Sequence, residues 1–214
     1  MQAARTGARL GSAAPLPYRA AAMEPCRLAV HDLACRRGDR LLFARLSFAL
    51  EPGAALQLAG ANGIGKSSLI RIIAGLLRPF AGRVERDGAL GLLDERPALD
   101  PQLPLGAALA LWRRIDGAGD MALDQLGLAN LLDVPVRYLS TGQKKRAALA
   151  RLIGQRAPLW LLDEPLNGLD TAGVALVEQL VAQHCRAGGI AVIASHQPFA
   201  VPGLERIALQ DFVA

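Results

Sequence analysis

A glycine-rich segment that ends in Lys66 and Ser67 is the part of the chain best suited to bind phosphate groups. Residues 60–67 follow the pattern Gly-x-x-x-x-Gly-Lys-Ser, with a strand-like run before them (54–59) and a helix-like run after them (68–74). In that arrangement the backbone N–H groups of the turn surround phosphates, the lysine reaches the β and γ oxygens, and the Ser67 hydroxyl ligates Mg²⁺. The residues predicted to bind a nucleoside triphosphate are Gly60, Ala61, Asn62, Gly63, Ile64, Gly65, Lys66, Ser67 and Ser68.

Two acidic residues, Asp163 and Glu164, follow a continuous apolar run at 159–162. Such a run is typical of a buried parallel strand, and ligands of parallel sheets gather at the carboxyl ends of the strands. We therefore expect Asp163 to hold Mg²⁺ through water, alongside Ser67, and Glu164 to orient and polarise an attacking water. As an isolated pair, the two acids would more simply be the solvated start of a loop.

A second place where phosphate could bind is the segment 138–147, which reads Tyr-Leu-Ser-Thr-Gly-Gln-Lys-Lys-Arg-Ala. Ser140 is a good N-cap residue, so the helix after it would present free N–H groups and the positive end of its dipole. Gly142 has no side chain to block an approaching anion, and such a surface binds phosphate. Taken alone, the segment could equally be a capped surface helix with a glycine near its start.

Together these segments resemble the motifs of ABC-type ATPases, in which two ATPase domains close on shared nucleotides. The likeness rests on Leu-Ser-x-Gly-Gln at 139–143, on the phosphate loop and on the acidic strand end, and the motifs occur in the family's order over most of 54–200. The resemblance implies that Ser140, Gly142 and Gln143 contact the ATP of a partner subunit.

The same resemblance implies roles for two further residues. Asp170 lies in the segment 166–170, which in the family acts across the dimer. His196 ends another short apolar run, and a histidine at this place in the family reaches the γ-phosphate. A lone histidine after a strand is more often a structural residue, but its position as the last of the ordered motifs favours the functional interpretation.

Two positions depart from the family's pattern. The place of the aromatic residue that stacks on adenine falls near Arg37, whose guanidinium could still stack on a flat ring. The place of a glutamine that touches Mg²⁺ and the transport partner falls at Arg96, and an arginine cannot ligate a cation. We expect Arg96 to face the partner or to pair with Asp94 or Glu95; either Glu95 substitutes for the glutamine or that contact is missing.

Composition limits the classes of protein that the chain can represent. It has 214 residues, enough for one sizeable core, and 52% of them are hydrophobic, yet no apolar run approaches the length of roughly 18 residues that spans a bilayer. The three cysteines are odd in number and lack metal-ligand spacing, which indicates a reducing compartment without disulfides. Of the net charge of +5, residues 1–22 contribute three arginines and no acid, and no basic, aromatic-rich surface for nucleic acid is predicted.

These motifs must be positioned by a parallel sheet, because strand-like and helix-like segments alternate along the chain. The resemblance makes the fold an α/β P-loop NTPase of the ABC nucleotide-binding type, with a RecA-like core, a small antiparallel β region and a helical subdomain at about 98–150. We expect residues 1–23 to be a disordered extension or the product of a start codon placed too early, and 24–214 to be the nucleotide-binding domain. Strands are predicted near 27–33, 45–50, 54–59, 83–86, 89–93, 159–162, 190–194 and 204–209, and a helix near 173–187.

Within the family, the compact chain is similar to the ATP-binding subunits of the cytochrome c maturation (haem exporter) system, notably at 35–43, 159–165 and 195–198. The resemblance implies a peripheral homodimer that hydrolyses ATP on the cytoplasmic face of the bacterial inner membrane. Its partners would be a CcmB-like integral membrane permease and further cytochrome c maturation proteins. Two alternatives stay open: an ABC ATPase for another cargo, and a module that binds ATP during assembly without hydrolysing it.

Overall fold

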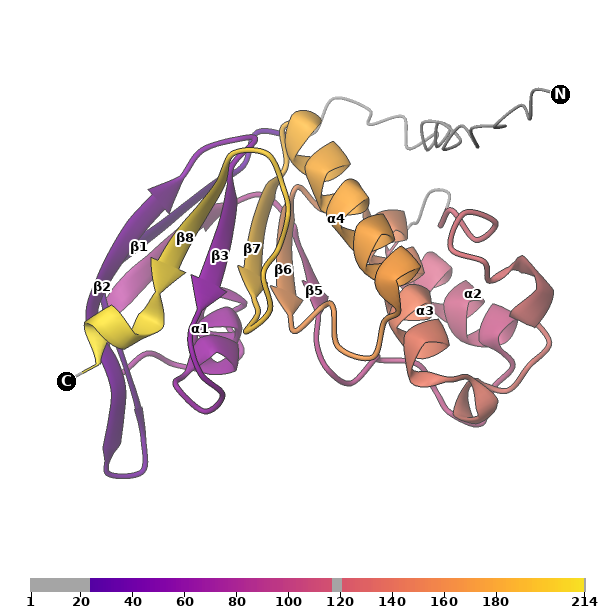
Figure 1. Cartoon of the computed structure of the whole chain (residues 1–214), viewed down its shortest axis with the longest axis horizontal. Coiled ribbons are helices and arrows are strands. Elements are labelled where there is room, and N and C mark those ends of the chain that lie inside the picture. Colours follow the sequence, from indigo (N-terminus) through magenta and orange to yellow (C-terminus); the bar gives the residue numbers. More distant parts are fainter. Residues whose placement is uncertain (1–23, 117–120, 214) are drawn as a thin grey trace, which may run out of the picture.

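The strands form two sheets (Figure 1) in the computed structural model, which describes residues 24–116 and 121–213. An antiparallel sheet has the order β2-β1-β4, and a parallel sheet has the order β5-β6-β7-β3-β8. The predicted extension at 1–23 lies outside the described residues. The strands are β1 (Arg27–Arg37), β2 (Arg40–Leu50), β3 (Ala55–Ala59), β4 (Ala81–Asp87), β5 (Leu90–Leu93), β6 (Leu159–Asp163), β7 (Ile190–Ala194) and β8 (Leu204–Ala208).

The helices divide between the sheet and one end of the molecule. In Figure 1 the antiparallel sheet lies at the left, α1 and α4 lie against the parallel sheet, and α2 and α3 lie together at the right, beyond β5 and β6. The predicted α/β architecture, a parallel sheet beside a small antiparallel region, is confirmed. The helices are α1 (Lys66–Ile73), α2 (Leu105–Asp116), α3 (Thr141–Gln155) and α4 (Thr171–Arg186), with short 3₁₀ helices η1 (Ala129–Leu131), η2 (Val136–Tyr138) and η3 (Leu209–Phe212).

In the predicted helical subdomain, the described part of the segment 100–138 contains one long helix. α2 covers 105–116, and η1 and η2 are single 3₁₀ turns. Pro104 and Pro135 form an isolated bridge that brings the two ends of the segment together. Prolines lack the N–H that a continuing helix needs, and glycine favours turns. Local apolar residues therefore pack from turns rather than from a second long helix.

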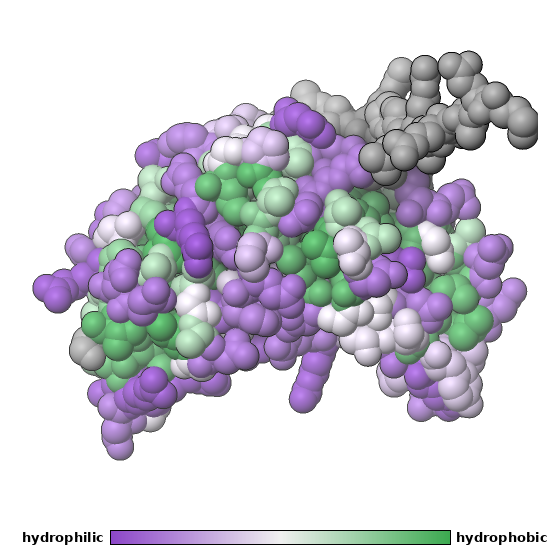
Figure 2. Space-filling view, viewed as in Figure 1, coloured by the Kyte–Doolittle hydropathy of each residue, from purple (hydrophilic) through white to green (hydrophobic). Residues whose placement is uncertain are grey.

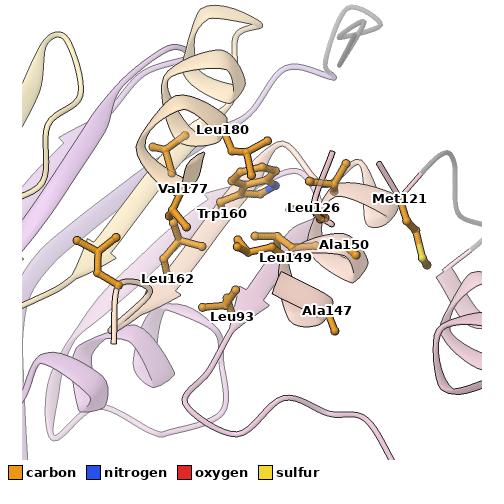
Figure 3. Packing of buried hydrophobic residues seen from close by; sticks show 14 of the residues in the cluster. Leu93, Met121, Leu126, Ala147, Leu149, Ala150, Trp160, Leu162, Val177 and Leu180 are labelled. Atoms are coloured by element: carbon orange, nitrogen blue, oxygen red, sulfur yellow. The ribbon is translucent and has the colours of Figure 1, made fainter. Parts of the chain in front are cut away.

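Strand β6 is buried on both faces, which explains its unbroken apolar sequence. Leu159 and Leu161 belong to one hydrophobic cluster, with residues of α1, and Trp160 and Leu162 belong to the other, with residues of α3 and α4. Successive side chains of a strand point to opposite faces, so one short strand joins both clusters. Figure 3 shows Trp160 surrounded by Val177, Leu180, Leu149 and Ala150.

A buried histidine holds the end of α4 against the sheet. His184 is fully buried, and its ring stacks on Trp160 with the ring centroids 3.9 Å apart. Its Nε2 lies 3.1 Å from the carbonyl oxygen of Pro158 and 3.2 Å from that of Ile190. Burial lowers the pKa of His184 to about 4, although the two carbonyls favour the protonated form. The imidazole is therefore neutral in the folded protein at physiological pH.

The surface carries both hydrophobic and hydrophilic residues. On the face seen in Figure 1, Figure 2 shows the hydrophobic residues in separate patches among hydrophilic ones. On α2, Leu111 and Ile115 are 47% and 61% exposed. No helix in the described parts of the chain has the length and apolar content needed to cross a membrane.

We expect His184 to make the free energy of unfolding depend on pH, with lower stability in acid. Because the unfolded histidine binds a proton below pH 6.5 and the folded one only near pH 4, stability is lost as pH falls through that window, by about 3 kcal/mol at pH 4. His184→Phe should be less stable than the wild type at pH 7, because it lacks the contacts to two carbonyls, and the difference should shrink as pH falls to 4. Urea unfolding at several pH values measures this; a constant difference between the two proteins would contradict it.

Candidate active site

The glycine-rich turn between β3 and α1 is built so that only glycine fits at its end. Gly65 is the N-cap of α1 and has φ = 116°, in the region that side chains rarely adopt. A Cβ at this position would lie 3.1 Å from a ring carbon of Phe43 and 3.3 Å from the Cβ of Leu42. The turn is thus pressed against β2, which fixes the direction in which α1 and Lys66 leave it.

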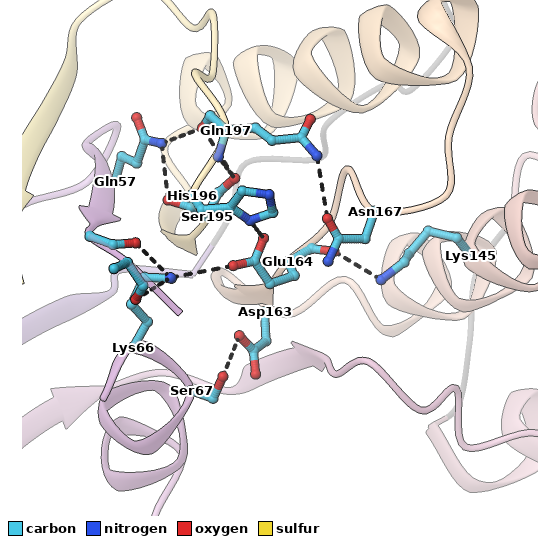
Figure 4. A network of polar contacts seen from close by, with 12 residues as sticks. Gln57, Lys66, Ser67, Lys145, Asp163, Glu164, Asn167, Ser195, His196 and Gln197 are labelled. Atoms are coloured by element: carbon cyan, nitrogen blue, oxygen red, sulfur yellow. Dashed lines mark hydrogen bonds and ion pairs between the residues drawn. The ribbon is translucent and has the colours of Figure 1, made fainter. Parts of the chain in front are cut away.

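Lys66 and Ser67, at the start of α1, reach the carboxylates at the end of β6 (Figure 4). The Lys66 ammonium donates to the carbonyls of Gly60 (2.8 Å) and Ala61 (3.2 Å) and lies 3.5 Å from Oε1 of Glu164. The Ser67 hydroxyl donates to Oδ1 of Asp163 at 2.9 Å. The structure therefore brings together the residues that the sequence predicts for phosphate, metal and water.

Glu164 is held in an unusual backbone conformation at the centre of this group. Its φ is 45°, in the left-handed region that costs a non-glycine residue roughly 1–2 kcal/mol. Its N–H donates to the carbonyl of Ala194 at 2.8 Å, and its Oε2 lies 2.9 Å from Nδ1 of His196. Strained residues of this kind persist only where their surroundings hold them, and they cluster at functional sites.

The turn after β7 that carries His196 is fixed by a buried glutamine of β3. Gln57 donates to the carbonyl of Gln197 at 2.7 Å, and the Ser195 hydroxyl donates to the same oxygen at 3.1 Å. The Gln197 N–H donates back to the Ser195 hydroxyl at 3.0 Å. These bonds fix the backbone at Ser195 and Gln197, on either side of His196. The backbone that carries the imidazole is therefore held in place for its contact with Glu164.

Asp163 is buried among other acids, and this changes its titration. Burial raises the pKa of Asp163, and the nearby carboxylates of Asp94, Glu95 and Glu164 raise it further, while the hydrogen bond from Ser67 opposes them. A cation bound beside Asp163 would therefore be attracted by several negative charges at once.

A cavity of about 430 Å³ lies in front of this group, and it holds most of the residues predicted to bind nucleotide. Arg37, predicted at the place of the adenine contact, lines the cavity together with its hairpin partner Arg40. A larger cavity of about 890 Å³ lies along β4 and contains none of the predicted site residues. The lining residues of the first cavity are Arg37, Arg40, Leu42, Asn62, Gly63, Gly65, Lys66, Ser67, Ser68, Glu95, Glu164 and Asn167.

Glu95 and Arg96 are adjacent in the chain but line different cavities. Glu95 lines the cavity in front of Lys66, whereas Arg96 lines a different cavity of about 340 Å³ between the sheet and α3. Asp94, expected as one partner for Arg96, instead lies 3.5 Å from Arg71 of α1. By position Glu95 is thus the residue next to the phosphate loop, one residue before the place assigned by counting along the sequence.

The Leu-Ser-x-Gly-Gln segment at 139–143, the signature segment, forms the capped start of α3, the signature helix, and lies apart from this cavity. Ser140 caps α3: its hydroxyl accepts from the Gln143 N–H at 3.2 Å, and its own N–H donates to Oε1 of Gln143 at 2.8 Å. The side chain of Gln143 is therefore used in a capping box. Asp170 caps α4 by accepting from the Gly173 N–H at 2.8 Å. Ser140, Gly142, Gln143 and Asp170 are not among the lining residues of the cavity that contains Lys66.

Three residues at or beside the site were not predicted from the sequence. Arg40 and Asn167 line the cavity. Lys145 is buried in α3 and donates to the main-chain carbonyl of Glu164 at 3.1 Å. Arg40 could have been found from its place opposite Arg37 in a hairpin, and Lys145 from the helical phase that puts it on the same face as Leu149.

Comparison with known proteins fixes the family. The sequence profile described as "ABC transporter" matches residues 43–167, more than half of the chain. The "Cytochrome c biogenesis ATP-binding export protein CcmA" of Novosphingobium aromaticivorans is 60% identical over 190 residues, which cover 89% of this chain and 99% of that protein. The chain belongs to the CcmA family of ABC transporter ATP-binding proteins. The protein of the same name from Sphingopyxis alaskensis is 52% identical over 85% of this chain and 96% of its own length.

A solved structure of an ABC transporter has the same fold. An inward-facing metal-chelate type ABC transporter contains a chain that is 27% identical, with a TM-score of 0.73 over 86% of this chain and 80% of that one. The resemblance to ABC-type ATPases that the motifs predicted is confirmed, and so is the expected P-loop NTPase fold.

The positions of Glu95 and Arg96 give a paired test in this CcmA-family protein. Glu95→Ala should raise the Mg²⁺ concentration needed for half-maximal ATPase activity several-fold, because it removes a carboxylate from the cavity that holds Ser67. Arg96→Ala should leave that concentration within about two-fold of the wild type, because Arg96 lines another cavity. Titration of ATPase activity with Mg²⁺ measures this concentration for both variants. A larger increase in Arg96→Ala than in Glu95→Ala would place Arg96 at the metal.

Proposed function

We propose that this ABC-type ATP-binding subunit binds and hydrolyses ATP to drive the haem-export step of cytochrome c maturation. The observation that carries the proposal is the connected cluster of Lys66, Ser67, Asp163, Glu164 and His196, of which Lys66, Ser67 and Glu164 line one cavity. Its coupling to cytochrome c maturation rests on similarity to the CcmA proteins over nearly their whole length.

The residues of the chain suit a hydrolysis in which positioning and charge matter most. The turn at 60–65 and Lys66 would bind the β- and γ-phosphates, the lysine exchanging its two carbonyl partners for phosphate oxygens. Glu164 would accept a proton from the attacking water or polarise it, and its contact with His196 would hold the carboxylate in line. His196, 41% exposed in its side chain, would reach the γ-phosphate from the far side of Glu164.

A magnesium ion fits the oxygen donors beside the phosphate loop. Ser67 and Asp163 bring a hydroxyl and a carboxylate within 2.9 Å of each other. Among residues 24–116 and 121–213, no group of three or more histidines, cysteines and acids could hold a metal alone. Mg²⁺ needs no such group, because it commonly takes one or two protein oxygens, waters and substrate phosphates. Ser67 and Asp163 would hold the ion, which when bound would supply positive charge to offset that of the phosphates.

The remaining predicted residues suit a shared site in a homodimer. Ser140 and Gly142 begin a long helix and are at least partly exposed, so their side of α3 can meet a phosphate of a second subunit. Asp170 begins α4 in the same region. We propose that the dimer works at the cytoplasmic face of the inner membrane with a CcmB-like permease and further maturation proteins.

Substitutions at Lys66 and Glu164 test the chemistry. Lys66→Ala should abolish productive ATP binding, because it removes the cation of the phosphate loop. Glu164→Gln should still bind ATP but hydrolyse it about 10²–10⁴-fold more slowly, because it lacks the positioned base. Nucleotide binding by calorimetry and phosphate release measure the two steps separately.

Glu205→Gln is the matched control, since it makes the same change at an exposed position of β8. It should behave like the wild type in both assays. Hydrolysis at the wild-type rate by Glu164→Gln would show that another residue polarises the water. An ATP-binding chain in which neither the wild type nor any variant hydrolyses ATP would instead favour the assembly module.

Mixing two inactive variants tests the shared site. In Lys66→Ala dimers and in Ser140→Arg dimers both sites are damaged, whereas a mixed dimer has one undamaged site formed by Lys66 of one chain and Ser140 of the other. ATPase activity should therefore rise when the two variants are combined, and it should stay below that of the wild type. Activity that stays at the level of the separate variants would mean that each chain forms its site alone.

The level of mature c-type cytochromes and the association of the protein with membranes test the transport role. Cells that carry Glu164→Gln in place of the wild type should lose mature c-type cytochromes, and the protein should be recovered with membranes only when its permease is present. Normal cytochromes together with loss of transport of another compound would show that the ATPase drives a different cargo.

A further inference from the structure

Lys145 is a buried cation that the proposed function leaves without a role. It lies in the second turn of α3 and is 7% exposed, whereas its neighbour Lys144 is half-buried. Lysines normally keep their ammonium in water, because an unpaired buried charge is costly. Burial of Lys145 therefore indicates that its ammonium has definite partners.

The nearest partner is the peptide oxygen of the residue that would polarise water. The Lys145 ammonium donates to the main-chain carbonyl of Glu164 at 3.1 Å, and Figure 4 shows it approaching from α3, on the other side of Glu164 from Lys66. The same carbonyl accepts from the Asn167 N–H at 3.3 Å. The lysine thus joins the signature helix to the end of β6.

Lys145 also lies in the field of four carboxylates. Burial lowers its pKa, and the charges of Glu95, Asp163, Asp94 and Glu164 oppose that change. Of the two cations near Glu164, Lys66 is the one proposed to bind phosphate. Lys145 is not among the lining residues of the cavity that contains Lys66, and its ammonium is bonded to the Glu164 carbonyl instead.

The bond from Lys145 acts where the backbone of Glu164 needs support. Glu164 has φ = 45°, a conformation that residues with side chains rarely adopt. Its N–H is held by Ala194, and its carbonyl is held by Asn167 and Lys145. With both ends of the residue fixed, the Cα–Cβ bond has one direction, and the carboxylate is aimed at Lys66 and His196.

We infer that Lys145 is a positioning residue for ATP hydrolysis, which fixes the backbone of Glu164 and ties it to the signature helix. The inference rests on the proposed function, because it gives Glu164 its role. It adds a consequence: the helix whose N-terminus would bind the nucleotide of the partner subunit is joined directly to the base of its own subunit.

The first test separates binding from turnover in the full-length chain, alone and in membranes with its transporter partners. Lys145→Met keeps the length of the side chain and removes its charge and its N–H groups. We expect its kcat to fall about 10- to 100-fold, because small misplacement of a reacting group has effects of this size. The dissociation constant for ATP should stay within about three-fold, because the phosphate loop is untouched.

Two further variants control for the loss of a lysine. Lys145→Arg keeps a cation and N–H donors and should recover most of the lost kcat. Lys144→Met makes the same chemical change one position earlier, where the ammonium donates to the carbonyl of Arg137 at 3.3 Å, and it should keep wild-type kcat. If Lys145→Met does not fold, as judged by its melting temperature, Lys145→Gln replaces it in every comparison.

A double mutant shows whether Lys145 acts through Glu164. In the Glu164→Gln background, adding Lys145→Met should lower single-turnover hydrolysis no further, because there is no carboxylate left to position. If the fold-losses in hydrolysis of Glu164→Gln and Lys145→Met multiply in the double mutant, the inference is overturned. An unchanged kcat in Lys145→Met would overturn it as well. An equal fall in Lys144→Met and Lys145→Met would also overturn it, since a general effect on α3 would then suffice. A wild-type chain without ATPase activity would refute the proposed function instead.

Discussion

Burial of two carboxylates at the end of β6 is the constraint on which the site depends. Asp163 and Glu164 are 2% and 6% exposed, and charges taken out of water destabilise a fold unless they are paired and hydrogen-bonded. Their partners come from parts of the chain that are far apart in sequence. The phosphate loop and the turn after β7 must be in place for the acids to be tolerated, because Ser67, Lys66 and His196 contact the carboxylates. Lys145 of α3 adds a bond to the main-chain carbonyl of Glu164.

Hydrophobic packing brings these partners to the acids. β6 is buried on both faces, so α1 on one side and α3 and α4 on the other are positioned by alternate side chains of a single strand. Truncation of such a side chain as Trp160 would cost about 3–5 kcal/mol, and it would also free the end of α4 held through His184. The core therefore does more than stabilise the domain, because it sets the distances among residues that carry the chemistry.

Features that depend on neighbours in the chain could be predicted from the sequence, and those that depend on distant contacts could not. The phosphate loop and the acids after an apolar strand are local patterns, and the structure places them together. The register of Glu95 depends on where β5 ends, which no local pattern specified. Lys144 and Lys145 look alike in the sequence, and only the apolar stripe of α3, with Leu149 one turn later, distinguishes the buried one.

The start of α3 cannot move independently of Glu164. The segment after Glu164 passes so close to the helix that a Cβ on Gly168 would lie 2.6 Å from the methyl group of Thr141, and Gly168 has φ = 77°. Lys145 forms the second connection, to the Glu164 carbonyl. Thr141 and Lys145 lie one turn apart on α3, and both contact the segment 164–168. These two contacts make a rigid link, because a rotation of α3 about either contact would break the other. Under the proposed dimer, a phosphate bound at the N-terminus of α3 is thus linked to the base of the opposite site by contacts within a single chain.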